Sequence, residues 1–233
     1  MQIENKRVQA WAISRSLHAA NKFFQEHNKI NNLLSLKPFL KDSCCIGLGQ
    51  FAPLVFKDSN LIKNVNGAFS FPEFRFIFNS PVQSLLKIQR VFNLIKNLHS
   101  QSNSEKQLSF LLYVGLEATV SYLNFDDRFK DFEEGGCIQF LLGKKEIGLA
   151  FLLKNEKGYW VNRIGQFQGN PNVKLIFKDV QLGIDACAGK LDNKEALSSG
   201  DFIAKGRIPL LDFVGYASRV AFSEISIFKQ NGI

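Results

Sequence analysis

The sequence predicts an α+β fold: a mainly antiparallel five-stranded sheet covered by helices, with an additional N-terminal α/β region. Three observations predict it. Strand-like segments follow one another at short spacings between residues 137 and 177. A capped helical segment then separates the fourth strand from a fifth at 202–206. A long apolar run with few charges, 208–222, predicts a closing helix.

Length and composition allow either one large domain or two small ones in 233 residues. The stretch "SQSNSEKQ", 100–107, is the only one that resembles a linker. We therefore expect two domains, 1–104 and 105–233. The 23 Phe residues, against 4 Tyr and 2 Trp, suit a large core and equally suit a pocket for an apolar ligand.

Charge and cysteine usage exclude several classes of site. The net charge is +8, but the Lys and Arg residues are scattered, so we expect no nucleic-acid partner. The four cysteines, Cys44, Cys45, Cys137 and Cys187, form no CxxC pair and lie far from the three histidines, so we expect no metal and no cofactor. The opening "MQIENKRVQAWAIS" lacks the features of a signal peptide, which predicts a cytoplasmic protein with free thiols.

The N-terminal region predicts helices followed by strands. Residues 3–36 repeat apolar positions at helical spacing and predict one or two helices, which Pro38 ends. The stretch "CCIGLGQFAPLVFKDSN" predicts strand and loop. In "FPEFRFIFNS", Phe alternates with other residues at 74, 76 and 78, which is typical of a strand.

A helix is expected from Pro81, with Ser80 as its cap. We expect its buried face to be Val82, Leu85, Leu86, Phe92 and Ile95. We expect its outer face to be Gln83, Lys87, Arg90 and Lys96. Such a basic amphipathic helix is either a solvated surface helix or one that lies on a membrane.

The next predicted helix, 108–123, is the most apolar segment of the chain. Ser109, Glu117, Thr119 and Ser121 interrupt it, so it is too short and too polar to predict a membrane span. Glu117 shares a stripe with Tyr113, Ser121 and Asn124. We expect that stripe to face solvent, and the alternative is a buried catalytic Glu117.

The strands beyond residue 136 predict a hairpin meander. "CIQFLLG", "EIGLAFLLKN" and "YWVNRIG" alternate apolar positions and are joined by short turns. "NVKLIFKD" predicts a fourth strand, and Asp179 is a suitable cap for a helix that runs to Gly189. The acidic stretch "NFDDRFKDFEEGG" predicts a solvated loop.

The order of elements from 137 to 222 resembles the sterol carrier protein 2 (SCP2-like) family of lipid-binding domains. That family typically shows a Gly-Lys/Glu-Leu-Asp/Asn turn, then Ser-Gly, a five-residue strand and a Gly. Here the turn is matched by Gly189, Lys190, Leu191 and Asp192. The Ser-Gly before the strand is matched by Ser199 and Gly200, and the Gly after it by Gly206. The resemblance covers about the last half of the chain. Two residues depart from the family pattern. Ile203 stands where an outward polar residue is usual, and Pro209 stands at the start of the last helix.

The resemblance implies a sheet with helices around a hydrophobic tunnel that holds a sterol-like, isoprenoid or acyl ligand. The strand faces and the closing helix, where Gly215 and Ala217 are small, would line it. The lipid-binding residues expected are Phe140, Leu149, Phe151, Leu175, Phe177, Phe202, Leu210, Leu211, Phe213, Val214 and Ala217. From the residues alone, a tightly packed core without a cavity stays open as an alternative.

No catalytic residues are expected. The stretch "GLGQF" has two glycines but lacks the third glycine of a Rossmann dinucleotide-binding motif. The sequence also contains no Gly-x-Ser-x-Gly motif and no P-loop. We therefore expect a lipid-binding or lipid-transport protein rather than an enzyme. Its expected partners are a lipid or other apolar small molecule and, transiently, an anionic membrane surface. The alternative is a protein-interaction or enzyme-accessory module that uses the same fold without bound lipid.

The N-terminal region also contains a loose echo of the second half. "GAFSFPEFRFIFNSPVQSLLKI" resembles "GQFQGNPNVKLIFKDVQLGIDAC" in the order Gly-x-Phe, strand and helix. A degenerate SCP2-like duplication is one interpretation, and chance similarity is the other.

Overall fold

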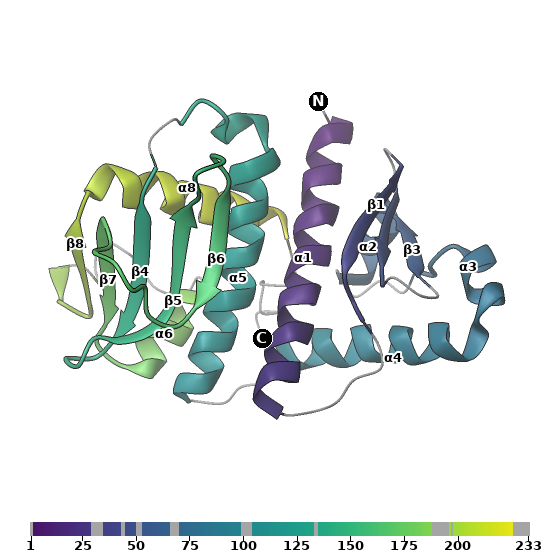
Figure 1. The fold of residues 1–233 in the computed structure, drawn as a ribbon, viewed down its shortest axis with the longest axis horizontal. Coiled ribbons are helices and arrows are strands. Elements are labelled where there is room, and N and C mark those ends of the chain that lie inside the picture. Colours follow the sequence, from purple (N-terminus) through teal and green to yellow (C-terminus); the bar gives the residue numbers. More distant parts are fainter. Residues whose placement is uncertain are drawn as a thin grey trace. The chain divides into compact units, whose positions relative to one another are not determined.

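The chain divides into two units in the computed structural model (Figure 1). The structure describes residues 2–28, 35–42, 45–49, 53–65, 70–98, 104–132, 135–187, 196 and 198–225. The first unit is Met1–Ser100 with Glu224–Ile227, and the second is Gln101–Ser223 with Phe228–Ile233.

The first unit combines a small antiparallel sheet with four helices. Its strands are β1 (Pro38–Asp42), β2 (Cys45–Leu48) and β3 (Leu54–Lys57), in the order β1-β2-β3. Its helices are α1 (Gln2–Asn28), α2 (Asp58–Val65), α3 (Phe74–Asn79) and α4 (Pro81–Leu98). The long helix α1 packs on α2, α4 and the sheet. An ion pair of 3.1 Å between Arg7 and Asp58 joins α1 to α2.

The predicted strand at "FPEFRFIFNS" is wrong, because residues 74–79 form helix α3. The amide of Glu73 donates to the carbonyl of Val55 at 2.8 Å, and the helix begins directly after this contact with β3. Phe74 and Phe78 are four residues apart, so a period of two is here also a helical i, i+4 pair. The two stretches that suggested a duplication therefore differ in secondary structure, since "NVKLIFKD" contains a strand.

Helix α4 forms where expected, but the prediction of its buried face is wrong. Its buried positions are Ser84, Lys87, Val91 and Leu94. Val82, Leu85, Leu86 and Phe92, which were expected inside, are exposed. Apolar residues occur on several sides of this helix, so their periodicity does not decide which side packs on α1 and β3.

The second unit contains a five-stranded mixed sheet in the order β6-β5-β4-β7-β8. Its strands are β4 (Cys137–Leu142), β5 (Ile147–Lys154), β6 (Trp160–Ile164), β7 (Val173–Phe177) and β8 (Phe202–Gly206). The meander β4-β5-β6 and the pair β7-β8 are antiparallel. The expectation of a mainly antiparallel sheet needs one correction: β7 crosses to the free edge of β4 instead of continuing beside β6, and pairs with β4 in parallel.

Helices α5 (Glu105–Phe125), α6 (Val180–Cys187) and α8 (Ile208–Glu224) accompany this sheet, with the short 3-10 helix η1 (Asp127–Phe129) after α5. The predicted cap Asp179 is confirmed, since its carboxylate accepts from the amide of Leu182 at 3.0 Å. The hydroxyl of the other predicted cap, Ser80, donates to the carbonyl of Asn79 at 2.8 Å. Ser104, which was not predicted as a cap, accepts from the amide of Gln107 at the start of α5. Helix α6 ends at Cys187, and the Gly189–Asp192 turn lies outside the described residues.

The glycines that bracket β8 have a conformational reason. Gly200 has φ +72 and Gly206 has φ +113, values that favour glycine. A Cβ at Gly206 would also lie only 2.1 Å from the carbonyl oxygen of Asn172. The two glycines that flank the fifth strand in the sequence therefore occupy special backbone positions at the ends of the edge strand β8.

The polar stripe on α5 does not face solvent as expected. Tyr113, Glu117 and Ser121 are buried. Asn124 bonds both the amide and the carbonyl of Trp160 in β6, at 2.8 and 2.9 Å. Among the described helices, α5 alone is long and apolar enough to cross a membrane, but 78% of its most apolar stretch is buried, as in the core helix of a globular domain.

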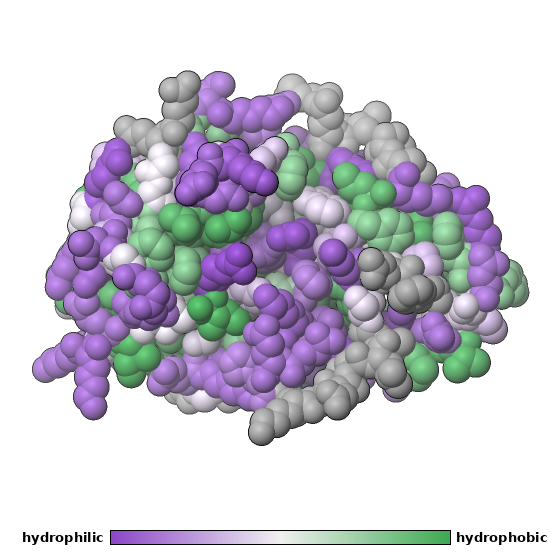
Figure 2. Space-filling model, viewed as in Figure 1, coloured by the Kyte–Doolittle hydropathy of each residue, from purple (hydrophilic) through white to green (hydrophobic). Residues whose placement is uncertain are grey.

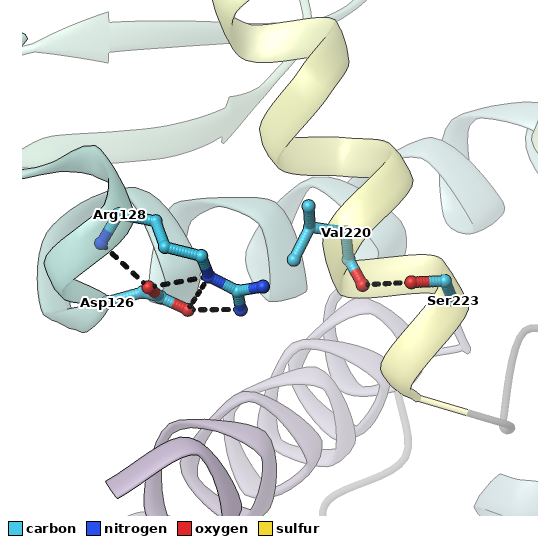
Figure 3. Close-up of polar contacts among 4 residues, drawn as sticks. All are labelled: Asp126, Arg128, Val220 and Ser223. Atoms are coloured by element: carbon cyan, nitrogen blue, oxygen red, sulfur yellow. Dashed lines mark hydrogen bonds and ion pairs between the residues drawn. The ribbon is translucent and has the colours of Figure 1, made fainter. Parts of the chain in front are cut away.

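The acidic stretch after α5 is only partly solvated. Asp127 and Asp131 are exposed, whereas Asp126 is 3% exposed and is held by Arg128 (Figure 3). The guanidinium Nε of Arg128 donates to both carboxylate oxygens of Asp126, at 2.9 and 3.1 Å. Glu133 and Glu134 lie outside the described residues.

Candidate functional site

The second unit contains a cavity of about 370 Å³ between the sheet and helices α5, α6 and α8. Most of its lining side chains are apolar. The lining residues are Leu111, Leu112, Gly115, Leu116, Phe140, Leu175, Phe177, Ala186, Cys187, Phe202, Leu211, Asp212, Val214, Gly215, Ser218, Arg219 and Phe222.

Four aromatic and aliphatic side chains from the sheet form one wall. Phe140 is the partner of Leu175 across the β4–β7 ladder, and Phe177 is the partner of Phe202 across β7–β8. Partners in a ladder share a face, and residues two apart on one strand share it too. The alternation of the strands therefore brings these four side chains together on one face.

Helix α8 supplies the opposite wall along one of its sides. Leu211, Gly215, Ser218 and Phe222 are spaced by three and four residues, so they lie along one stripe. A Cβ built on Gly215 would meet only the guanidinium of Arg219, at 3.8 Å. The missing side chain at 215 thus leaves open space beside the helix.

Helices α5 and α6 close the remaining sides. Gly115 lets the ring of Phe222 approach, since a Cβ there would lie 3.1 Å from that ring. Gly183 allows α6 to approach α5, because a Cβ at 183 would lie 2.5 Å from Leu108. Gly115 and Phe222 line the cavity, so the close approach of α5 and α8 at this point bounds it.

Few polar groups reach the cavity. The Ser218 hydroxyl lies 3.1 Å from that of Thr119 and 3.0 Å from the carbonyl of Val214, so it is satisfied within the helices. Asp212 and Arg219 are exposed residues of α8. Burial raises the pKa of the Cys187 thiol to about 12, although the residue as a whole is only half-buried. The cavity wall is therefore uncharged at neutral pH except where α8 meets solvent.

This set of side chains does not assemble a recognisable catalytic group. Among the described lining residues, Ser218 is hydrogen-bonded within the helices, and the raised pKa of Cys187 keeps it as a thiol. Among the residues that the structure describes, no group of three His, Cys, Asp or Glu side chains could hold a metal ion. What the arrangement can do chemically is bury apolar surface, in a volume at the lower end of the range for small-molecule sites.

The structure places six of the eleven residues expected to bind lipid at this cavity. They are Phe140, Leu175, Phe177, Phe202, Leu211 and Val214. Their role toward a lipid stays a prediction.

The other five lie outside the cavity, because of the register of β5 and because of the side of α8 on which they lie. In β5, Phe151 is the partner of Gln139, so it lies on the other face from Phe140, where its ring contacts Phe167 at 5.3 Å. Leu149 is buried beside the register shift in the same ladder. In α8, Leu210 and Ala217 are fully buried outside the lining, and Phe213 stacks on Phe132 with ring centroids 3.6 Å apart.

Helices α5, α6 and the end of α8 also contribute lining residues that were not predicted from the sequence. Leu111, Leu112, Gly115 and Leu116 come from α5, Ala186 and Cys187 from α6, and Phe222 from the end of α8. Their apolar character was visible, but which side of each helix faces the sheet is set by packing.

Arg128 and Asp126 help to fix the segment that supports α8. Arg128 donates its backbone amide and its guanidinium to the carboxylate of Asp126 (Figure 3). Burial alone would raise the pKa of Asp126, but the hydrogen bonds and charge of Arg128 outweigh it and hold the pKa below its usual range. The next residue, Phe129, packs its ring edge-on against Phe213 of α8 at 5.8 Å.

Comparison with known proteins finds no matching family model and no matching curated protein. Among solved structures, the chain is similar to the solution structure of the sterol carrier protein domain 2 of Helicoverpa armigera. The identity is 16% and the TM-score 0.38, over 57% of this chain and 99% of that one. It is also similar to a stereoselective inverting sec-alkylsulfatase from Pseudomonas sp., with 12% identity and TM-score 0.28 over 66% of this chain and 29% of that one. A double mutant of the sulfatase gives 12% identity and TM-score 0.30, over 66% of this chain and 31% of that one. This chain thus spans less than a third of either sulfatase chain, and all three likenesses are distant.

Proposed function

We propose that this protein is a lipid-binding carrier that holds one apolar or amphiphilic molecule in the cavity of its second unit and catalyses no reaction. The observation that carries the proposal is the 370 Å³ cavity with its wall of Phe, Leu and Val side chains. The three described cysteines are free thiols, which suits the cytoplasmic location that we also propose.

Burial of the ligand would supply the binding free energy. Each buried CH₂ group contributes about 0.8 kcal/mol. A chain of about a dozen carbons would thus contribute on the order of 10 kcal/mol before the cost of ordering it. A polar head group of the ligand would lie at the solvent side of the cavity, beside the exposed Arg219 and Asp212 of α8. The ligand classes we propose are acyl chains, isoprenoids and sterol-like molecules.

The proposal is tested by native mass spectrometry of gently purified full-length protein, followed by titration with a fluorescent fatty acid. We expect co-purifying lipid or saturable binding, with displacement by the unlabelled acid. Isoprenoid and sterol analogues in the same displacement assay rank the ligand classes. A folded protein that binds none of these saturably would reject the carrier and favour the interaction module.

A further inference from the structure

Helices α3 and α4 present apolar side chains to solvent. Five large residues on these helices are between 48% and 77% exposed. They are Phe74, Phe78, Val82, Leu85 and Leu86, which we call the α3–α4 face. Figure 2 shows hydrophobic side chains at the surface over this part of the first unit. A cluster of this kind on one short segment differs from the singly scattered apolar residues of ordinary surfaces.

The face points outward because polar contacts hold the opposite side of α4 against its own unit. Ser84 is fully buried and Lys87 is 3% exposed. The guanidinium Nε of Arg90 donates to Asn21 of α1 at 2.6 Å. A surface helix normally turns its apolar side to the core and its polar side to water. Here the buried side of α4 carries the polar Ser84 and Lys87 beside Val91 and Leu94, while Val82, Leu85 and Leu86 lie outside. The outward side therefore matches an apolar medium better than it matches water.

The charge around the face has one sign. Residues 74–98 contain Arg75, Lys87, Arg90 and Lys96 and no acidic residue. Lys96 is exposed and lies eleven residues, about three turns, beyond Leu85, on the same side of the helix. At the other end Glu73 pairs with both Lys41 and Arg75, at 3.3 Å each, so this trio keeps one net positive charge. The face is therefore apolar with cations at its two ends.

We propose that the α3–α4 face docks on an anionic lipid bilayer. Phe, Leu and Val side chains would enter the boundary between head groups and acyl chains, while Lys96 and Arg75 meet anionic head groups. The charges favour a bilayer over a second copy of this chain, because two such faces would bring like charges together. The inference goes beyond the carrier function, since docking needs no ligand in the cavity.

The test is flotation of the full chain with vesicles of phosphatidylcholine alone or mixed with phosphatidylserine. We expect binding to the mixed vesicles that weakens as salt is raised. The double variant Leu85→Ser/Leu86→Ser removes apolar surface and should lower the vesicle partition coefficient by about tenfold or more. Lys96→Glu should lower it by about tenfold on the mixed vesicles only.

The matched control is Ile203→Ser in β8 of the second unit. Ile203 is 46% exposed, close to the 48% of Leu86, so it removes a similar exposed side chain outside the face. This variant should bind vesicles as the parent chain does, and melting curves should show all variants folded. Fluorescent fatty acid binding should be unchanged in the α3–α4 variants.

Three results would overturn the proposal: a folded parent chain that ignores the mixed vesicles, a double variant that binds as well as its parent, or a dimer that the double variant converts to monomer. The last would make the face a self-association surface. A folded protein that binds the mixed vesicles but shows no saturable binding of any lipid in its cavity would instead reject the carrier function and leave docking intact.

Discussion

The hydroxyls of Thr119 and Ser218 lie 3.1 Å apart and join α5 to α8 beside the cavity. Thr119 is fully buried, and its hydroxyl also lies 3.2 Å from the carbonyl of Gly115 one turn earlier. Two helices that are far apart in sequence thus meet through a polar contact at the edge of an apolar space.

Replacing Thr119 with Val should destabilise the second unit by about 1 kcal/mol, because the isosteric change removes this hydrogen bond and leaves Ser218 with only its backbone partner. Chemical denaturation, followed with a probe in the second unit, measures this change in the free energy of unfolding. The control is Ser223→Ala, which removes an exposed hydroxyl that donates to the carbonyl of Val220 at 2.9 Å near the end of α8 (Figure 3). Equal effects of the two substitutions would deny the contact any special role.

The substitution Gly215→Leu should block ligand binding without loss of stability. Gly215 faces the cavity and its Cβ would have open space, while glycine inside a helix costs about 1 kcal/mol relative to alanine. We therefore expect an unchanged or higher melting temperature and no saturable binding of the fluorescent fatty acid.

Ala217→Leu is the matched substitution two residues away. Ala217 is fully buried and outside the lining, so leucine should overpack the core and cost about 1–3 kcal/mol. If the two variants lose the same stability, the space beside Gly215 is not an open cavity in solution.

Asp126 should make the second unit sensitive to acid. Its folded pKa lies below the ordinary 3.8, so its contribution is present above about pH 3.8 and is lost as the pH falls through the folded pKa. We expect the melting temperature of Asp126→Asn to fall less than that of the parent between pH 5 and pH 2. Parallel pH profiles for the two proteins would contradict the assignment.

Cys187 should react slowly with alkylating reagents. With a pKa of about 12 instead of the ordinary 9.0, its thiolate fraction at neutral pH is roughly a thousandfold smaller. Mass spectrometry of quenched digests should show little modification of Cys187 at pH 8 and faster modification as the pH rises. Added fatty acid should slow the reaction further, since Cys187 lines the cavity. Modification as fast as that of a free cysteine would contradict the raised pKa.

The sequence by itself determined the order of elements in the second unit. The meander strands, the capped α6, β8 between its two glycines and α8 form where periodicity and turn residues predict them. The reason is that alternation, caps and positive-φ glycines are local properties, readable over a few residues. The same alternation places Leu175 and Phe177 on one side of β7, whereas their pairing with Phe140 and Phe202 depends on the ladders.

Only the tertiary structure decided how those elements face one another. Phe151 lies on the other face because the ladder pairs it with Gln139, and α4 buries Lys87 while it exposes Leu85. Register and helix rotation depend on partners that are distant in the chain, and no local pattern encodes them when apolar residues occur on several sides. For the same reason the residues that α5 and α6 contribute to the cavity could not be predicted from local patterns.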